Sequence, residues 1–338
     1  MYSLNRIASK SAPHTPFPAL DHPSGARTIG YQSSCSRVFP GVVSQTLLVS
    51  HYRNPSDMNA KITVVIDNCV PIGASAPFVG EHGLSMLIET QNKRLLLDTG
   101  QSSAIIHNLG LLGISPASID LIAISHGHYD HTGGLYPLLT QARKTLPLYL
   151  HKDAFRARYA VSGGTRKFIG IPHRREQLEA LGADFRMVRE PTEILPDMWL
   201  SGPVPRSTNF ETGDARLVVH DDATDCDYQD EISDDMALFY KGSQGLVVVS
   251  GCTHSGLVNM VRHGLAITGA ARLQGWIGGT HLGPVSGSQQ DQTIAELLAF
   301  APDFVAANHC TGFQMMSRLQ QSFGDRFIPA FVGTVIEF

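Results

Sequence analysis

The feature that most constrains this chain is the stretch 119–135, which reads IDLIAISHGHYDHTGGL. An apolar run, Leu121 to Ile124, stops at a polar loop with a glycine, and this pattern predicts a buried strand that opens into a functional loop. Within six residues the loop carries four side chains that can bind a metal: His126, His128, Asp130 and His131. Imidazole and carboxylate groups at this density predict a site for a divalent metal such as zinc.

The size and charge of the chain limit the classes of function. With 338 residues, the chain can hold one large α/β domain with an insertion. A formal net charge of −4 gives no sign of the basic surface that nucleic-acid binding requires. No apolar run approaches the roughly 20 residues that a membrane helix needs. Five cysteines without regular spacing favour a reducing compartment, so we expect a cytoplasmic protein that acts on a small molecule.

Residues 1–57 differ in composition from the rest of the chain. They are rich in Ser, Pro and Arg and show weak apolar periodicity, which predicts disorder. Two interpretations stay open. The segment is either an organellar transit peptide or an extension of the gene model upstream of a true start at Met58. In both cases we expect the folded domain to span residues 58–338.

Three strands predicted in the second half of the chain also end beside a histidine. The strands are 246–250, 273–277 and 304–307, and the histidines that follow them are His254, His281 and His309. The first of these loops also contains Cys252. Packing alone does not explain the same pattern at four strand ends. We therefore expect one site at the edge of a sandwich, built from the strand ends of both sheets.

Two further segments carry candidate site residues. Glu81 and His82 follow the first predicted strand, 61–68, and either touch substrate beside the metal or lie in solvent. Asp98 ends the predicted strand 94–97. We expect its carboxylate to orient the ligand loop by accepting backbone or imidazole N–H groups.

Residues 136–235 have the weakest periodicity. A basic cluster is either a solvated face or a site for a phosphate or carboxylate of the substrate. Its members are Arg166, Lys167, His173, Arg174 and Arg175. The acidic stretch 218–235 is predicted to be an exposed loop, with Asp234 or Asp235 facing the site.

The motif HGHYDH at 126–131 resembles the HxHxDH signature of the metallo-β-lactamase superfamily, and DTG at 98–100 resembles its first motif. Other motifs are IDN at 66–68, EHG at 81–83, SGCTHSGL at 250–257, GGTHL at 278–282 and NHCTG at 308–312. Together they resemble the branch known as 7,8-dihydropterin-6-yl-methyl-4-(β-D-ribofuranosyl)aminobenzene-5′-phosphate synthase, which acts in methanopterin biosynthesis. The resemblance implies an αββα metallo-β-lactamase sandwich, here with an inserted α+β segment around residues 140–235.

The resemblance also implies one or two metal ions. His126, His128 and His254 would hold one ion, and Asp130, His131 and His309 would hold the second. In the β-lactamases a bridging Asp follows the glycine where this chain has Cys252, so Cys252 is a bridge, a ligand or a bystander. His281 is an extra ligand or an acid/base. Asp130, Glu81 and His82 are further candidates for catalysis. Zinc is the expected metal, with manganese and iron as alternatives.

Four candidate functions follow from these residues and the resemblance. The first is a hydrolase in which a metal-bound hydroxide attacks an ester, lactone or phosphoester. The alternative is a synthase that displaces diphosphate from a pterin by an aryl ring, so that the substrate is phosphorylated or pterin-like. A di-iron redox protein ranks below both, because position 128 is His and not a carboxylate. A binding protein without chemistry is disfavoured by the full set of His and Asp ligands.

Overall fold

The computed structural model describes residues 48–49, 60–221 and 223–338. The prediction that residues 1–57 are a leader or an extension lies outside these ranges, except for the short strand β1 (Leu48–Val49). In this described part of the chain, no helix has the length and apolar character needed to cross a bilayer.

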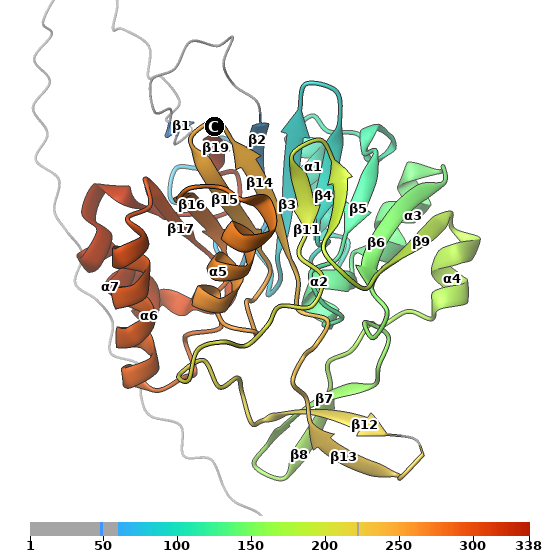
Figure 1. The fold of residues 1–338 in the computed structure, drawn as a ribbon. Coiled ribbons are helices and arrows are strands. Elements are labelled where there is room, and N and C mark those ends of the chain that lie inside the picture. The colour runs from blue at the N-terminus through green and yellow to red at the C-terminus, as the bar shows by residue number, and fades with distance from the viewer. Residues whose placement is uncertain (1–47, 50–59, 222) are drawn as a thin grey trace, which may run out of the picture. The chain divides into compact units, whose positions relative to one another are not determined.

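Two β-sheets lie at the centre of the domain (Figure 1). The first sheet has the strand order β1-β19-β2-β3-β4-β5-β6-β9. Its longer strands are β2 (Ala60–Ile66), β3 (Ser85–Thr90), β4 (Arg94–Leu97), β5 (Leu121–Ala123), β6 (Leu146–His151), β9 (Ala183–Val188) and β19 (Val335–Glu337). The second sheet has the order β10-β11-β14-β15-β16-β17-β18. Its strands are β10 (Thr192–Leu195), β11 (Met198–Leu200), β14 (Ala237–Gly242), β15 (Gly245–Ser250), β16 (Leu273–Gly278), β17 (Phe304–Ala307) and β18 (Phe327–Pro329).

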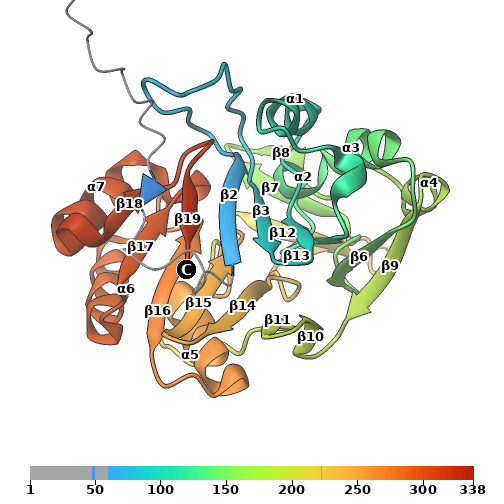
Figure 2. The same ribbon diagram turned by 90° about the horizontal axis from the view of Figure 1, so that it is seen from above.

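Helices cover the outer face of each sheet (Figure 2). The first sheet carries α1 (Ala104–Leu111), α3 (Leu135–Ala142) and α4 (Arg175–Ala180). The second carries α5 (Leu257–Thr268), α6 (Gly287–Phe300) and α7 (Gly312–Phe323). One apolar core lies between the sheets and one lies under each helix layer. This confirms the predicted αββα sandwich.

The burial of both sheet faces explains the apolar runs of the sequence. Strand β15 (GLVVVS) alternates between two cores: Val247 and Val249 face the other sheet, while Leu246 and Val248 lie under the helices. A strand with two buried faces reads as a continuous apolar run. Because β4, β5, β6 and β9 are parallel, as are β15, β16, β17 and β18, their carboxyl ends share an edge within each sheet.

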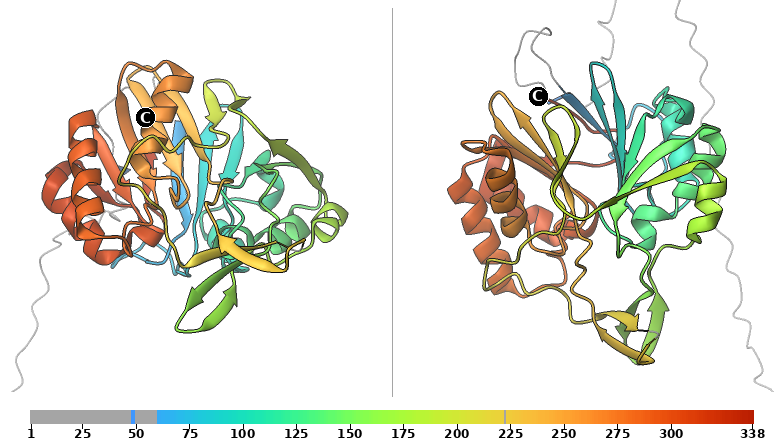
Figure 3. Two further views of the ribbon diagram at one scale, coloured as in Figure 1. Left: turned by 60° about the horizontal axis from the view of Figure 1, so that its bottom comes forward. Right: turned by 45° about the vertical axis from the view of Figure 1, so that its right-hand side comes forward.

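A third sheet lies beyond this edge (Figure 3). It is antiparallel, with the order β13-β12-β7-β8, and consists of β7 (Arg158–Ser162), β8 (Thr165–Phe168), β12 (Leu217–Asp221) and β13 (Cys226–Gln229). The prediction of an exposed acidic loop at 218–235 is therefore wrong, because β12 and β13 form a hairpin there. Leu217, Ile169 and Ile232 form a small buried cluster beneath it. Residues 140–235, predicted as an insertion, contribute strands to all three sheets.

Candidate metal centre

The loop after β5 brings the HGHYDH motif into the interior. His126 lies in a bend and His128 in extended chain, and the single turn α2 (Tyr129–Thr132) follows with Asp130 and His131. All four side chains are buried. Gly127 allows this path, since a Cβ there would lie 1.9 Å from the carbonyl oxygen of Ala154.

The first group of metal donors consists of His126, His128 and His254. His126 Nε2 lies 2.9 Å from His128 Nδ1, and the His254 ring centre lies 4.8 Å from that of His126. Burial lowers the pKa of His128 to about 3 and holds the pKa values of His126 and His254 well below the usual range. These imidazoles are therefore neutral and offer lone pairs.

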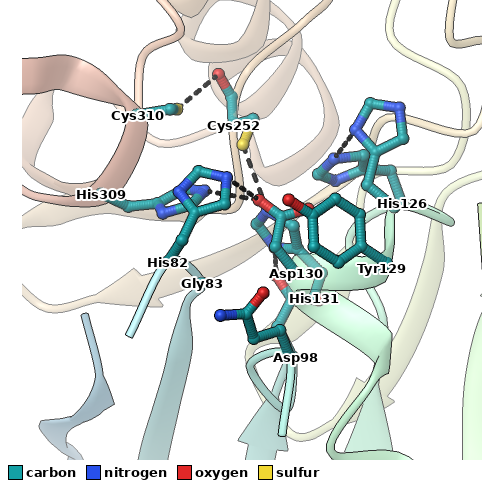
Figure 4. Close-up of polar contacts among 12 residues, drawn as sticks. His82, Gly83, Asp98, His126, Tyr129, Asp130, His131, Cys252, His309 and Cys310 are labelled. Carbon is teal, nitrogen blue, oxygen red and sulfur yellow. Dashed lines mark hydrogen bonds and ion pairs between the residues drawn. The ribbon is translucent and has the colours of Figure 1, made fainter. Parts of the chain in front are cut away.

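The second group consists of His82, Asp130 and His309. Asp130 Oδ2 lies 3.2 Å from His82 Nε2 and 3.3 Å from His309 Nε2 (Figure 4). Burial alone would raise the pKa of Asp130, but His131, His309 and His82 hold it well below its usual range. Asp130 is thus an ionised, buried carboxylate. The sequence prediction placed His131 in this group and His82 among catalytic residues, whereas the geometry places His82 with the donors.

His131 and Cys252 lie between the two groups. His131 Nε2 is 3.2 Å from Cys252 Sγ and 3.8 Å from Asp130 Oδ2. Together with His126, these two residues form another set of close donor atoms. Burial would lower the pKa of His131, but Asp98 and Asp130 raise it to about 9. The same negative carboxylates would favour a bound cation.

Asp98 orients two of the histidines. Its carboxylate accepts hydrogen bonds from the Ser125 backbone N–H, the Ser125 hydroxyl and His131 Nδ1–H, each at 2.7 Å. Because the single Ser125 hydroxyl proton goes to Asp98, Ser125 Oγ accepts from His126 Nδ1–H at 2.9 Å. Asp98 therefore accepts backbone and imidazole N–H groups, as predicted, and the Nε2 atom of His131 points away from it.

Asp67 and Asn68 orient His309 in the same way, and the sequence analysis gave them no role. The Asp67 carboxylate accepts the backbone N–H of His309 at 2.7 Å. Asn68 Oδ1 accepts His309 Nδ1–H at 2.9 Å, and it also accepts the Gly83 N–H. His309 Nε2 is thereby turned toward Asp130. The available signal was a polar pair directly after the buried strand β2.

The two acids expected to face the site have other partners. Asp234 Oδ2 accepts the Gly127 N–H at 2.8 Å, and its carboxylate binds the guanidinium of Arg158 at 2.6 Å. Asp235 accepts the Ser255 N–H at 2.8 Å. Both acids therefore hold loops that carry candidate ligands. The sequence analysis also missed Arg158, which is fully buried and has no local sequence signal.

Glu81 and His281 differ in what they contact. The Glu81 carboxylate accepts the N–H groups of Gln101 and Ser102 at 2.9 and 3.1 Å, and also the Ser102 hydroxyl. It is committed to the loop after DTG, so we leave it out of the proposed catalytic residues. The His281 ring centre lies 4.4 Å from that of His254, and its Nε2 lies 3.3 Å from Asp214 Oδ2.

The chemistry of these donors fits a metal. Among the described residues, two buried ring nitrogens of the first donor group, His128 Nε2 and His254 Nε2, have no hydrogen-bond partner. A buried polar atom without a partner is costly, and bound cations are one of the ways in which proteins satisfy such atoms. Neutral imidazoles, an ionised carboxylate and a thiol form a donor set suited to zinc or a similar ion.

Comparison with known proteins gives an independent view. The family model of the metallo-beta-lactamase superfamily matches residues 79–221. The 7,8-dihydropterin-6-methyl-4-(β-D-ribofuranosyl)-aminobenzene-5′-phosphate synthase of Methanocaldococcus jannaschii is 31% identical, over 79% of this chain and 93% of the relative. An uncharacterized protein of the same organism is 33% identical, over 81% of this chain and 99% of its own length. The crystal structure of a metal-dependent hydrolase of the beta-lactamase superfamily superposes with a TM-score of 0.70 at 26% identity, covering 82% of this chain and 99% of that structure.

Proposed function

Because the chain belongs to the metallo-β-lactamase superfamily, we propose that it is a metal-dependent enzyme that joins a dihydropterin to the amino group of a ribofuranosylaminobenzene phosphate. The sequence alone favours a hydrolase first and this synthase reaction second, and the named relative reverses that order. The observation that carries the proposal is the convergence of neutral imidazoles and one ionised carboxylate on a buried spot, with ring nitrogens that lack partners.

We assign the two donor groups to two ions. One ion would be held by His126, His128 and His254, and the other by His82, Asp130 and His309, with His131 and Cys252 between them. Zinc suits this mixture of nitrogen, oxygen and sulfur donors, and manganese and iron are the alternatives. When bound, the ions would supply Lewis acidity that stabilises negative charge on a departing diphosphate.

His281 is our candidate proton donor. Burial would lower its pKa, but Asp214 and Cys310 raise the pKa of His281 to about 9, so the ring is protonated at neutral pH. His281 lines the same pocket as the donors Asp130 and His309. A proton held on this ring could pass to the leaving phosphate oxygen, since a general acid must sit beside the reacting group.

A hydrolase is the second candidate, and the structural similarity to a metal-dependent hydrolase favours it. The same residues would then position an ester, lactone or phosphoester for attack by water. The two reactions differ in product. The synthase would form a bond between the pterin methylene carbon and the amino nitrogen of the aminobenzene, while the carbon–oxygen bond to diphosphate breaks and the amine loses a proton. The hydrolase would add water to its substrate.

The proposal is tested first by metal analysis of protein purified without added metal. We expect the wild type to hold zinc, manganese or iron, and His128→Ala to lose at least one ion per chain. His107→Ala is the matched control, because His107 is exposed and lies outside both donor groups. Unchanged metal in His128→Ala, or no metal in the wild type, would contradict the proposal.

The reaction is tested with a dihydropterin diphosphate and ribofuranosylaminobenzene phosphate, with products identified by mass. A product that contains both the pterin and the aryl ring supports the synthase. Release of a hydroxymethyl pterin without the aryl ring, or turnover of phosphodiesters or lactones alone, would favour the hydrolase.

A further inference from the structure

The candidate metal donors form one side of a pocket, and the third sheet forms the other. The cavity of this pocket has a volume of about 220 Å³. Asp130, His254 and His309 line it on the donor side. Residues of the third sheet and its flanking loop line it on the other side: Ala160, Lys167, Ile169 and Leu217. The pocket thus combines the donors with a wall of different chemistry.

Lys167 on β8 is the only Lys or Arg among the described residues that line this pocket. Its Nζ donates to the hydroxyl of Tyr129 at 3.2 Å and lies 4.7 Å from the centre of that ring. Tyr129 also lines the pocket and stands in the chain between His128 and Asp130. The lysine of the third sheet is therefore joined directly to the ligand loop.

Lys167 has no acidic partner in the described part of the chain, unlike its neighbour Arg166. The Arg166 guanidinium pairs with Asp227 at 2.8 Å and lies 3.6 Å from the centre of the Tyr159 ring. Arg166 and Lys167 are successive residues of one strand, so their side chains point to opposite faces. Among the described residues, no carboxylate lies within ion-pairing distance of Lys167. An ammonium group without an acidic partner at the wall of a pocket is suited to an anion from outside the chain.

We propose that Lys167 and Tyr129 bind a phosphate group of the substrate, while the apolar wall packs against its ring. This inference rests on the proposed function, since it names the part of the site that would recognise a phosphorylated aromatic substrate. Ile169 and Leu217 are buried with Ile232, and Tyr129 and Ala160 pack against them, so the wall is a firm apolar surface. A compact ammonium group and a phenolic hydroxyl donor match the oxygens of a phosphate. The third sheet thereby determines substrate choice, and the metal donors carry the chemistry.

The experiment uses the metal-loaded full chain and phenyl phosphate as the probe, with binding followed by calorimetry. We expect Lys167→Gln to weaken phenyl phosphate binding by about tenfold or more, because a hydrogen bond to a charged group is lost. Arg166→Gln is the matched control on the same strand, and its affinity should equal that of the wild type. The dependence of affinity on salt should also be weaker in Lys167→Gln than in the wild type.

The outcomes separate this inference from the proposed function. If Lys167→Gln holds as much metal as the wild type and binds phenyl phosphate equally well, the inference is wrong and the metal-enzyme proposal stands. If Arg166→Gln loses as much affinity as Lys167→Gln, general surface charge is responsible and the specific site is refuted. A wild type without metal refutes the proposed function, irrespective of Lys167.

Discussion

Arg158 joins the third sheet to the loop that carries the candidate ligands, and its replacement by Met is a strong test of how that loop is held. The side chain is fully buried. Its guanidinium donates to Asp230 at 2.7 Å and to the two carboxylate oxygens of Asp234 at 2.6 and 3.0 Å. Asp234 in turn accepts the N–H of Gly127, inside HGHYDH. Arg158→Met keeps the apolar stem and removes only the charge and its donors.

The expected loss of stability in Arg158→Met follows from the hydrogen bonds that its two partner carboxylates keep. The two buried carboxylates would lose their common partner and would keep the hydrogen bonds from the N–H groups of Gly127 and Ile232. Removing one partner of a buried ion pair destabilises a protein by about 3–5 kcal/mol. That is a large part of the roughly 5–15 kcal/mol that a folded protein has in total. We expect the urea midpoint of Arg158→Met to fall accordingly.

The effect should depend on pH, because an unpaired buried carboxylate holds its proton more tightly in the folded than in the unfolded chain. The loss of stability should therefore be smallest near the unfolded Asp pKa of about 3.9 and grow as the pH rises above it. Urea unfolding of wild type and variant between acidic and neutral pH measures this difference.

A triple variant separates charge from packing. Arg158→Met with Asp230→Asn and Asp234→Asn has no buried charge at this position, so it should recover at least half of the lost stability. If the triple variant is no more stable than Arg158→Met alone, the uncompensated carboxylates are not the cause and the reasoning fails.

Two further predictions concern groups that position the site. Asp98→Asn should weaken metal binding by about 10–100-fold, because orienting partners of metal-bound histidines contribute that much to affinity. Competition with a chelator measures the affinity. An unchanged affinity would contradict the orienting role that we infer from the hydrogen bonds of Asp98 to Ser125 and His131. Glu211 accepts the N–H groups of Val258 and Asn259 at the start of α5. Burial raises the pKa of Glu211 above its ordinary value of 4.5, so its ionisation destabilises the fold as the pH rises through that value. Glu211→Gln removes this ionisation, and its unfolding free energy should fall less than that of the wild type between pH 4.5 and 7; equal pH profiles would contradict the raised pKa.

Much of the fold was predictable, because its strands carry local signals. A strand covered on both faces must be apolar throughout, and β5, β15 and β17 all show such runs before a polar loop. Helices on the outer faces and sheets in the middle follow from that pattern. The acidic hairpin β12–β13 was missed, since its short apolar face is hidden among exposed acids.

The sequence by itself determined which residues stand at the strand ends, because apolar runs and glycines are properties of neighbouring residues. It placed His126, His128, His254 and His309 there without any knowledge of their contacts. Only the tertiary structure decided how these rings are aimed and what else joins them. The Asp67–His309 bond spans 242 positions and the Gly127–Asp234 bond spans 107, and no local periodicity reports such pairs. The placement of Lys167 opposite the donors was decided in the same way, because it depends on how a separate sheet packs against the edge of the sandwich.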